Sequence, residues 1–176
     1  MTQIIVLNGG SSSGKTGIAR CLQAILPQPW LRLGVDELIE ALPPSLTDSG
    51  SGLAFGQRGE IVVGERFWEA EAAWMTGVAA MAQAGARIIL DEVFLGGAAS
   101  QARTRSHLEG LDVLWAGVRC DPRIAAARET ARGDRVKGMA ESQAEIVHNG
   151  VVYDIEVDSG SLEALDCARL IAACVV

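Results

Sequence analysis

The chain of 176 residues is long enough to bury a core around one central sheet, and 49% of its residues are hydrophobic. Its formal charge of -7, from 15 basic and 22 acidic residues, repels the phosphates of nucleic acids and anionic lipids alike. With no apolar run of the roughly 18 residues that a membrane helix needs, we expect one soluble, cytoplasmic domain over residues 1–176, with neither nucleic acid nor a membrane as partner.

Short apolar runs alternate with longer segments of helical spacing, which is typical of parallel strands joined by crossover helices. The first run, 3–7, leads through a Gly/Ser loop into a helix over 15–26, and the second, 30–35, leads into a short helix over 36–42. The remaining strands are expected over 87–93, 113–119 and 152–157. This pattern predicts an α/β fold with a five-stranded parallel sheet and helices on both faces.

Residues 45–66 differ from the rest of the chain because glycines interrupt them repeatedly. The portion over 53–63 is suited to a hairpin that turns near 57–59. We interpret 43–66 as an insert that covers the acceptor of a reaction. A long amphipathic helix follows it, and Gly85 is expected to end this helix.

The most specific motif is a phosphate loop that satisfies the GxxxxGK[ST] spacing between a predicted strand and a predicted helix. Its members are Gly9, Gly10, Ser11, Ser12, Ser13, Gly14, Lys15 and Thr16. Glycines allow backbone N–H groups to turn towards phosphate oxygens, and the helix N-terminus adds partial positive charge. The motif predicts ATP as a substrate, with Lys15 at its β- and γ-phosphates and Thr16 on Mg²⁺.

Carboxylates follow two of the predicted strands. Asp91 comes after the apolar run 88–90, where a Mg²⁺-binding Asp is found in phosphate-loop proteins. Glu92 follows at once, and because successive strand residues point to opposite faces we expect only one of the pair to face the nucleotide. The alternative is that these acids simply face solvent at the strand end.

Asp36 closes the second predicted strand, beside the sheet edge where open α/β folds bind their ligands. A carboxylate at this edge can orient an acceptor hydroxyl and take its proton, so we assign Asp36 as a general base. The alternative is that Asp36 only caps the following helix.

Basic residues cluster between 119 and 137 in an otherwise acidic chain. Arg128, Arg132 and Arg135 recur at helical steps, so one face can reach a transferring phosphoryl group and stabilise its charge. We expect Arg128 to bind the nucleotide, Arg132 and Arg135 to act in catalysis, and 123–145 to form a lid-like segment. The alternative is an ordinary solvated surface.

An anionic acceptor requires several basic residues around it, yet Arg58 and Arg66 are the only ones between positions 36 and 75. The same stretch is rich in large apolar side chains, namely Leu38, Leu42, Leu53, Phe55, Phe67, Trp68 and Trp74. We therefore expect an uncharged, largely apolar acceptor with a free hydroxyl.

The chain resembles the chloramphenicol 3-O-phosphotransferase family over almost its whole length. The segments that carry the resemblance are LNGGSSSGKTGIARCLQ, GVDELIEALP, AGARIILDEVFLGGAA, LDVLWAGVRCD, RETARGDRVKGMA and VVYDIEVD, in the family's order. The resemblance implies a fold similar to nucleoside monophosphate and shikimate kinases. It also implies ATP-dependent phosphorylation of the primary 3-hydroxyl of chloramphenicol, and hence resistance to that antibiotic.

Residue by residue, the resemblance places the family's phosphate loop on 9–16, its base on Asp36 and its lid arginines on Arg132 and Arg135. Asp91 matches the first of the family's paired acids, whereas Glu92 replaces an Asp. The least similar part is 45–66, which we expect to lie over the acceptor.

Two other functions fit the same motifs. A metabolic kinase of the shikimate or gluconate type also has a phosphate loop and a base near the position of Asp36, and a positively charged acceptor pocket would favour it. A regulatory module would bind ATP without transferring phosphate and would use the arginines to sense the terminal phosphate.

Overall fold

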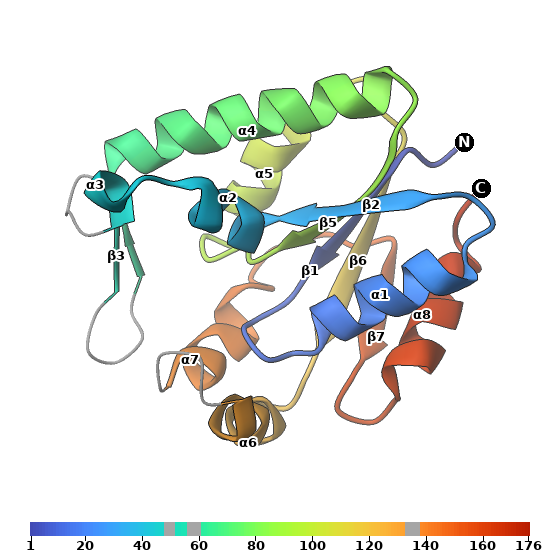
Figure 1. The fold of residues 1–176 in the computed structure, drawn as a ribbon. Coiled ribbons are helices and arrows are strands. Elements are labelled where there is room, and N and C mark those ends of the chain that lie inside the picture. The colour runs from blue at the N-terminus through green and yellow to red at the C-terminus, as the bar shows by residue number, and fades with distance from the viewer. Residues whose placement is uncertain (48–51, 56–60, 133–137) are drawn as a thin grey trace.

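The computed structural model describes residues 1–47, 52–55, 61–132 and 138–176 (Figure 1). In chain order, its elements are β1 (Ile4–Asn8), α1 (Lys15–Ile25), β2 (Trp30–Gly34), α2 (Val35–Ala41), α3 (Pro44–Thr47), β3 (Leu53–Phe55), β4 (Ile61–Val63), α4 (Glu65–Gln83), β5 (Arg87–Glu92), α5 (Ala98–His107), β6 (Val113–Arg119), α6 (Pro122–Arg132), α7 (Met139–Ile146), β7 (Ile155–Asp158) and α8 (Ala164–Ala172).

The central sheet has five strands in the order β2-β5-β1-β6-β7, and all neighbouring strands are parallel. Helices α1 and α8 lie on one face and α4 and α5 on the other (Figure 1). This arrangement confirms the predicted α/β fold with helices on both faces. The two chain ends lie side by side, because the Thr2 amide donates to the Val176 carbonyl oxygen at 2.6 Å.

Successive side chains of β1 point to opposite faces of the sheet, and both faces are buried. Ile5 and Leu7 pack into the core beneath α1 and α8, whereas Ile4 and Val6 pack into a second core beneath α4. All four side chains are fully or almost fully buried. A strand that is apolar on both faces is typical of a parallel sheet covered by helices.

Most element boundaries lie within one residue of the predictions, and the largest difference is at the last strand. The hairpin consists of β3 and β4, paired antiparallel with Leu53 opposite Val63 as predicted, and its predicted turn near 57–59 lies outside the described residues. The last strand was predicted to begin at Val152 but begins at Ile155. The backbone of Val152 cannot join the ladder there, because its N–H and C=O both bond to the side chain of Gln101.

Strand register determines where the functional residues meet. Asn8, the last residue of β1, lies opposite Glu92, and Gly34, the last residue of β2, lies opposite Asp91. The phosphate loop, α2 and the paired acids therefore leave the sheet at the same carboxyl-terminal edge, where ligands bind in open α/β folds. Among the described helices, none is long and apolar enough to cross a membrane.

Candidate active site

Residues 9–14 connect β1 to α1, and two of their glycines occupy positions that a side chain would disturb. A Cβ atom added to Gly9 would lie 2.6 Å from the Val118 carbonyl oxygen. Gly14 has a φ of 90°, in the left-handed region that favours glycine, and α1 starts directly after it. The backbone can therefore approach a phosphate closely at the positive end of the α1 dipole.

Lys15 is buried at the start of α1 and lies among groups from the loop and from β5. Its ammonium group donates to the carbonyl oxygens of Gly9 at 2.8 Å and Gly10 at 3.0 Å, and it lies 3.7 Å from Asp91 Oδ1. The hydroxyl of Thr16 donates to Asp91 Oδ2 at 3.2 Å. The structure thus brings Lys15, Thr16 and Asp91 together, as the sequence predicted for a nucleotide and its metal ion.

The donor set suits a triphosphate with Mg²⁺. The hydroxyl oxygens of Ser12 and Ser13 are buried without a hydrogen-bond partner in the described part of the chain, so a phosphate oxygen would satisfy groups that are otherwise left unpaired. Thr16 and Asp91 offer oxygen ligands, which Mg²⁺ prefers. No cluster of three or more His, Cys, Asp or Glu side chains that could hold a metal occurs among the described residues, and Mg²⁺ commonly takes its other ligands from phosphates and water.

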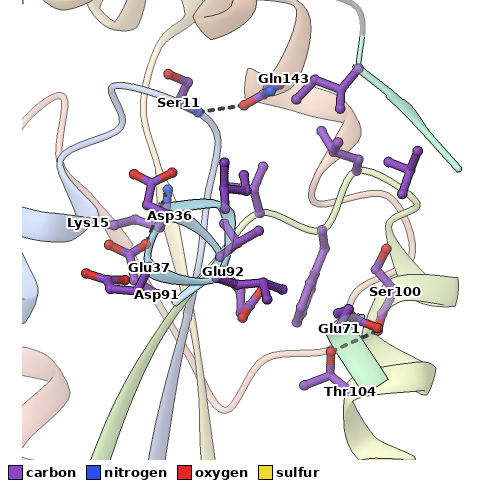
Figure 2. A pocket seen from close by; sticks show the side chains of 18 of the residues that line it. Ser11, Lys15, Asp36, Glu37, Glu71, Asp91, Glu92, Ser100, Thr104 and Gln143 are labelled. Atoms are coloured by element: carbon purple, nitrogen blue, oxygen red, sulfur yellow. Dashed lines mark hydrogen bonds and ion pairs between the residues drawn. The ribbon is translucent and has the colours of Figure 1, made fainter. Parts of the chain in front are cut away.

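Asp36 is the second residue of α2 and does not close β2 as predicted, because the strand already ends at Gly34. Gly34 also occupies the N-cap position of α2, so Asp36 is not the cap of this helix. The side chain of Asp36 is exposed and lines the same pocket as the phosphate loop. Figure 2 shows Asp36 and Asp91 on the side of the pocket where Lys15 lies.

Asp91 and Glu92 both line this pocket, although strand alternation had suggested that only one of them would face the nucleotide. The pocket extends past the end of β5, so the two side chains reach it in different directions (Figure 2). Burial raises the pKa of Glu92 to about 8, and the neighbouring carboxylates of Asp91 and Glu71 add to this effect. Near neutral pH Glu92 is therefore mainly in its protonated, uncharged form.

The pocket has a volume of about 750 Å³, which is in the range of small-molecule sites. One end is formed by the phosphate loop and by the acids described above. The remaining wall is largely apolar and comes from α2, the hairpin, α4 and the segment after β5: Leu38, Ile39, Leu53, Ile61, Phe67, Trp68, Trp74, Met75 and Phe94. A polar compartment beside the phosphate loop and a largely apolar compartment are therefore continuous.

Gln143 lines the pocket (Figure 2) although no sequence motif indicates it. It lies on α7, is buried, and its Oε1 accepts a hydrogen bond of 2.8 Å from the Ser11 amide in the phosphate loop. A glutamine carries no motif of its own, so only the tertiary contact between α7 and the loop reveals it.

The predicted arginines occupy different places. Arg128 donates through Nη2 to the Ser159 carbonyl oxygen at 2.7 Å, and the Ser159 hydroxyl in turn donates to the carbonyl oxygen of Ser13 in the phosphate loop. Arg128 thus lies beside the loop but is not among the residues that line the described pocket. Arg132 is the last residue of α6, and Arg135 lies outside the described residues. Their catalytic roles stay predictions.

Comparison with known proteins agrees with this geometry. Residues 2–176 match the family described as chloramphenicol phosphotransferase-like protein. The chain belongs to this family. The match confirms the resemblance that the motifs showed, and it spans the phosphate loop, the Asp36 helix and the arginine segment alike. With the phosphate-loop kinase fold, it identifies the chain as a small-molecule kinase.

Relatives and solved structures support the same fold. A Mycobacterium tuberculosis protein named "Putative O-phosphotransferase" is 29% identical over 191 residues, which cover 95% of this chain and 79% of that protein. A sugar kinase from Janibacter sp. has a TM-score of 0.73 at 18% identity (98% of this chain, 94% of that chain). A tunicamycin resistance protein from Deinococcus radiodurans has a TM-score of 0.69 at 22% sequence identity, over 98% of this chain and 95% of that chain. Shikimate kinase from Acinetobacter baumannii, in complex with shikimate, has a TM-score of 0.61 at 17% sequence identity, over 97% of this chain and 91% of that chain.

Proposed function

We propose that this family member transfers the terminal phosphoryl group of ATP to the primary 3-hydroxyl of chloramphenicol or of a closely similar uncharged alcohol. The observation that carries this proposal is that the phosphate loop, Asp36 and a large apolar wall line one pocket. The product would carry a dianionic group on the hydroxyl, and the activity would confer resistance to the antibiotic in the cytoplasm, where ATP is available.

On the nucleotide side, the loop amides and the Lys15 ammonium would hold the phosphate chain, with Thr16 and Asp91 as ligands of Mg²⁺. When bound, the metal ion neutralises charge on the phosphate oxygens. Lys15 stabilises negative charge that moves towards the leaving diphosphate, because its ammonium is fixed and shielded from water.

On the acceptor side, Asp36 would accept a hydrogen bond from the acceptor hydroxyl and fix its oxygen in line with the terminal phosphorus. As the new O–P bond forms, the bond from that phosphorus to the bridging oxygen of ADP breaks, and the hydroxyl proton passes to Asp36. The products are the phosphorylated alcohol and ADP. We also propose that 43–66 covers the acceptor and that 123–145 closes over the nucleotide, with Arg132 and Arg135 at the transferring group and Arg128 on the nucleotide.

The apolar wall supports an aromatic, uncharged acceptor such as chloramphenicol. Phe67, Trp68 and Phe94 line the same pocket as Asp36, and aromatic side chains of this kind pack against planar rings. A kinase for shikimate or gluconate would need unpaired cations to bind the acceptor carboxylate. Each basic residue that lines the described pocket instead has a carboxylate partner, which disfavours that alternative.

The direct test is to incubate the purified protein with Mg-ATP and chloramphenicol and to analyse the products by mass spectrometry. We expect a mono-phosphorylated product, with the phosphate on the primary hydroxyl by NMR. The same reaction with chloramphenicol already acetylated at the primary hydroxyl should give no product. An unmodified drug, after prolonged incubation with protein that binds ATP, would show that chloramphenicol is not the acceptor.

A further inference from the structure

We propose that Glu71 and Arg103 form a second polar subsite in the acceptor compartment. This subsite binds an uncharged group that has both a hydrogen-bond donor and an acceptor, such as a primary amide, and it rejects carboxylates. The inference rests on the proposed function in so far as the compartment holds the phosphoryl acceptor, and it adds the chemical class of that acceptor.

Two helices on the same face of the sheet build the subsite. Glu71 lies on α4 and Arg103 on α5, and Arg103 Nε lies 3.5 Å from Glu71 Oε1. The Arg103 guanidinium carbon also lies 4.1 Å from the ring centre of Trp68, which precedes Glu71 by one helical turn. Stacking on the indole and pairing with the carboxylate restrict Arg103 to one orientation, so the side chains are arranged before any ligand binds.

The subsite lies away from the place of phosphoryl transfer. Figure 2 shows Glu71, with Ser100 and Thr104, on the opposite side of the pocket from Lys15, with Glu92 between them. Glu71 and Arg103 both line the pocket, as does Trp68. A molecule whose hydroxyl meets the phosphate end can therefore extend across the compartment and place a second polar group against Glu71 and Arg103.

The hydrogen-bonding groups are complementary to a neutral ligand. Within the described part of the chain, the Arg103 guanidinium makes a single hydrogen bond, through Nε, so its two terminal amino groups remain available as donors. The side chain of Glu71 is only 17% exposed, and its carboxylate is an acceptor. An amide presents a C=O to the guanidinium and an N–H to the carboxylate at once, without burying a net charge.

The charge of the pocket explains why a carboxylate would be rejected. The basic residues lining its described part are Lys15, Arg32 and Arg103, and they are paired with Asp91, Glu37 and Glu71 respectively. Acidic residues outnumber them even without Glu92, because Asp36 and Glu40 line the pocket as well. An anionic ligand at the terminal amino groups of Arg103 would lie beside the Glu71 carboxylate, and this like charge is unfavourable in a partly buried site.

The test uses two probes of one shape, para-(hydroxymethyl)benzamide and para-(hydroxymethyl)benzoate, which differ in charge at the end remote from the alcohol. Their dissociation constants would be measured by protein-observed NMR titration in the presence of Mg²⁺ and a non-hydrolysable ATP analogue. We expect the wild-type protein to bind the benzamide at least about 10-fold more tightly than the benzoate, in line with the energy of a charge left uncompensated in a recognition site.

Substitutions distinguish the contribution of Glu71 to probe binding from that of Arg103. Glu71→Gln releases Arg103 from its carboxylate, so the benzoate should gain about 10-fold in affinity and the preference should disappear or reverse. Adding Arg103→Gln to Glu71→Gln should remove that gain. Glu69→Gln, on an exposed position of the same helix, is the matched control and should keep the wild-type ratio. Thermal unfolding of each variant reports that it is folded.

The proposal is overturned if the wild-type protein binds the benzoate as tightly as the benzamide, if it binds neither probe, or if Glu71→Gln leaves the ratio unchanged. These outcomes are distinct from failure of the proposed function. A protein that discriminates between the probes as expected but leaves chloramphenicol unmodified would keep the subsite and lose that acceptor. A protein that phosphorylates chloramphenicol with no such discrimination would lose the subsite alone.

Discussion

Asn8 is the residue at which β1 passes into the phosphate loop, and its side chain ties this junction to other segments. Its Nδ2 donates to the Val147 carbonyl oxygen at 2.8 Å and to the Tyr153 hydroxyl at 2.6 Å, while its Oδ1 accepts from the Phe94 amide at 2.9 Å. The Tyr153 hydroxyl also lies 2.6 Å from His148 Nδ1. The loop is therefore supported by a buried polar network, in which the loss of one member leaves another unpaired.

His148 makes this network sensitive to acid. Burial lowers the pKa of His148 from 6.5 to about 4, so the folded protein keeps the ring neutral while the unfolded chain takes up a proton as the pH falls below 6.5. The unfolded state then binds more protons, and the free energy of unfolding decreases as the pH falls from 6.5 towards 4. We expect this residue alone to contribute a loss of about 2 kcal/mol between pH 7 and pH 4.5.

The measurement is urea unfolding at a series of pH values for the wild-type protein and for His148→Gln. The variant should be less stable at pH 7, because a buried hydrogen bond changes, but it should lose less stability on acidification than the wild type. Carboxylates titrate in both proteins, so the difference between the two slopes isolates the histidine. Parallel pH profiles would show that His148 does not titrate in this way.

At the scale of elements, a buried carboxylate on α6 forms hydrogen bonds with the backbone at the start of α7. Glu129, near the end of α6, is buried and accepts hydrogen bonds of 2.8 Å from the amides of Gly138 and Ala140 at the start of α7. Gln143 on α7 then bonds to the Ser11 amide of the phosphate loop. These contacts link α6, through α7, to the phosphate-loop end of the pocket.

Arg135 follows α6 in the sequence and lies outside the described residues, and we predict a role for it in the transition state. Arg135→Ala should lower kcat by about 100-fold while the affinity for ATP changes much less, because a guanidinium that stabilises developing charge acts on the chemical step. Steady-state kinetics with varied ATP and varied acceptor would measure this. Arg123→Ala is the matched control, since the Arg123 side chain is 94% exposed at the start of α6. A kcat equal to that of the control would remove Arg135 from the mechanism.

At the scale of the whole molecule, features that depend on local pattern could be predicted from the sequence. The apolar runs of β1, β5 and β6 and the spacing of the phosphate loop are local, and the parallel sheet and the meeting of Lys15, Thr16 and Asp91 followed from them. The place of Asp36 was predicted to within one element, since Asp36 is the second residue of α2 and not the last residue of β2.

Features that depend on which helix faces meet could not be predicted. Glu71, Arg103 and Gln143 carry no motif, and they reach the pocket only because α4, α5 and α7 pack around the same sheet edge. The apolar spacing along α4 likewise does not predict which side chains are buried. Met81 fits this spacing but is 37% exposed, whereas Met75 is buried. The start of β7 depended on a side chain, Gln101, that lies far from it in the sequence.

The central claim is that the Asp36 carboxylate and the phosphate loop act on one acceptor hydroxyl, and Asp36→Asn tests it most directly. Single-turnover transfer from labelled ATP would be measured together with ATP affinity, and Glu40→Gln, one turn further along the same helix, is the control. We predict that Asp36→Asn slows transfer at least about 100-fold with ATP affinity unchanged, because only the proton acceptor is lost. Transfer at the rate of the Glu40→Gln control would contradict the account.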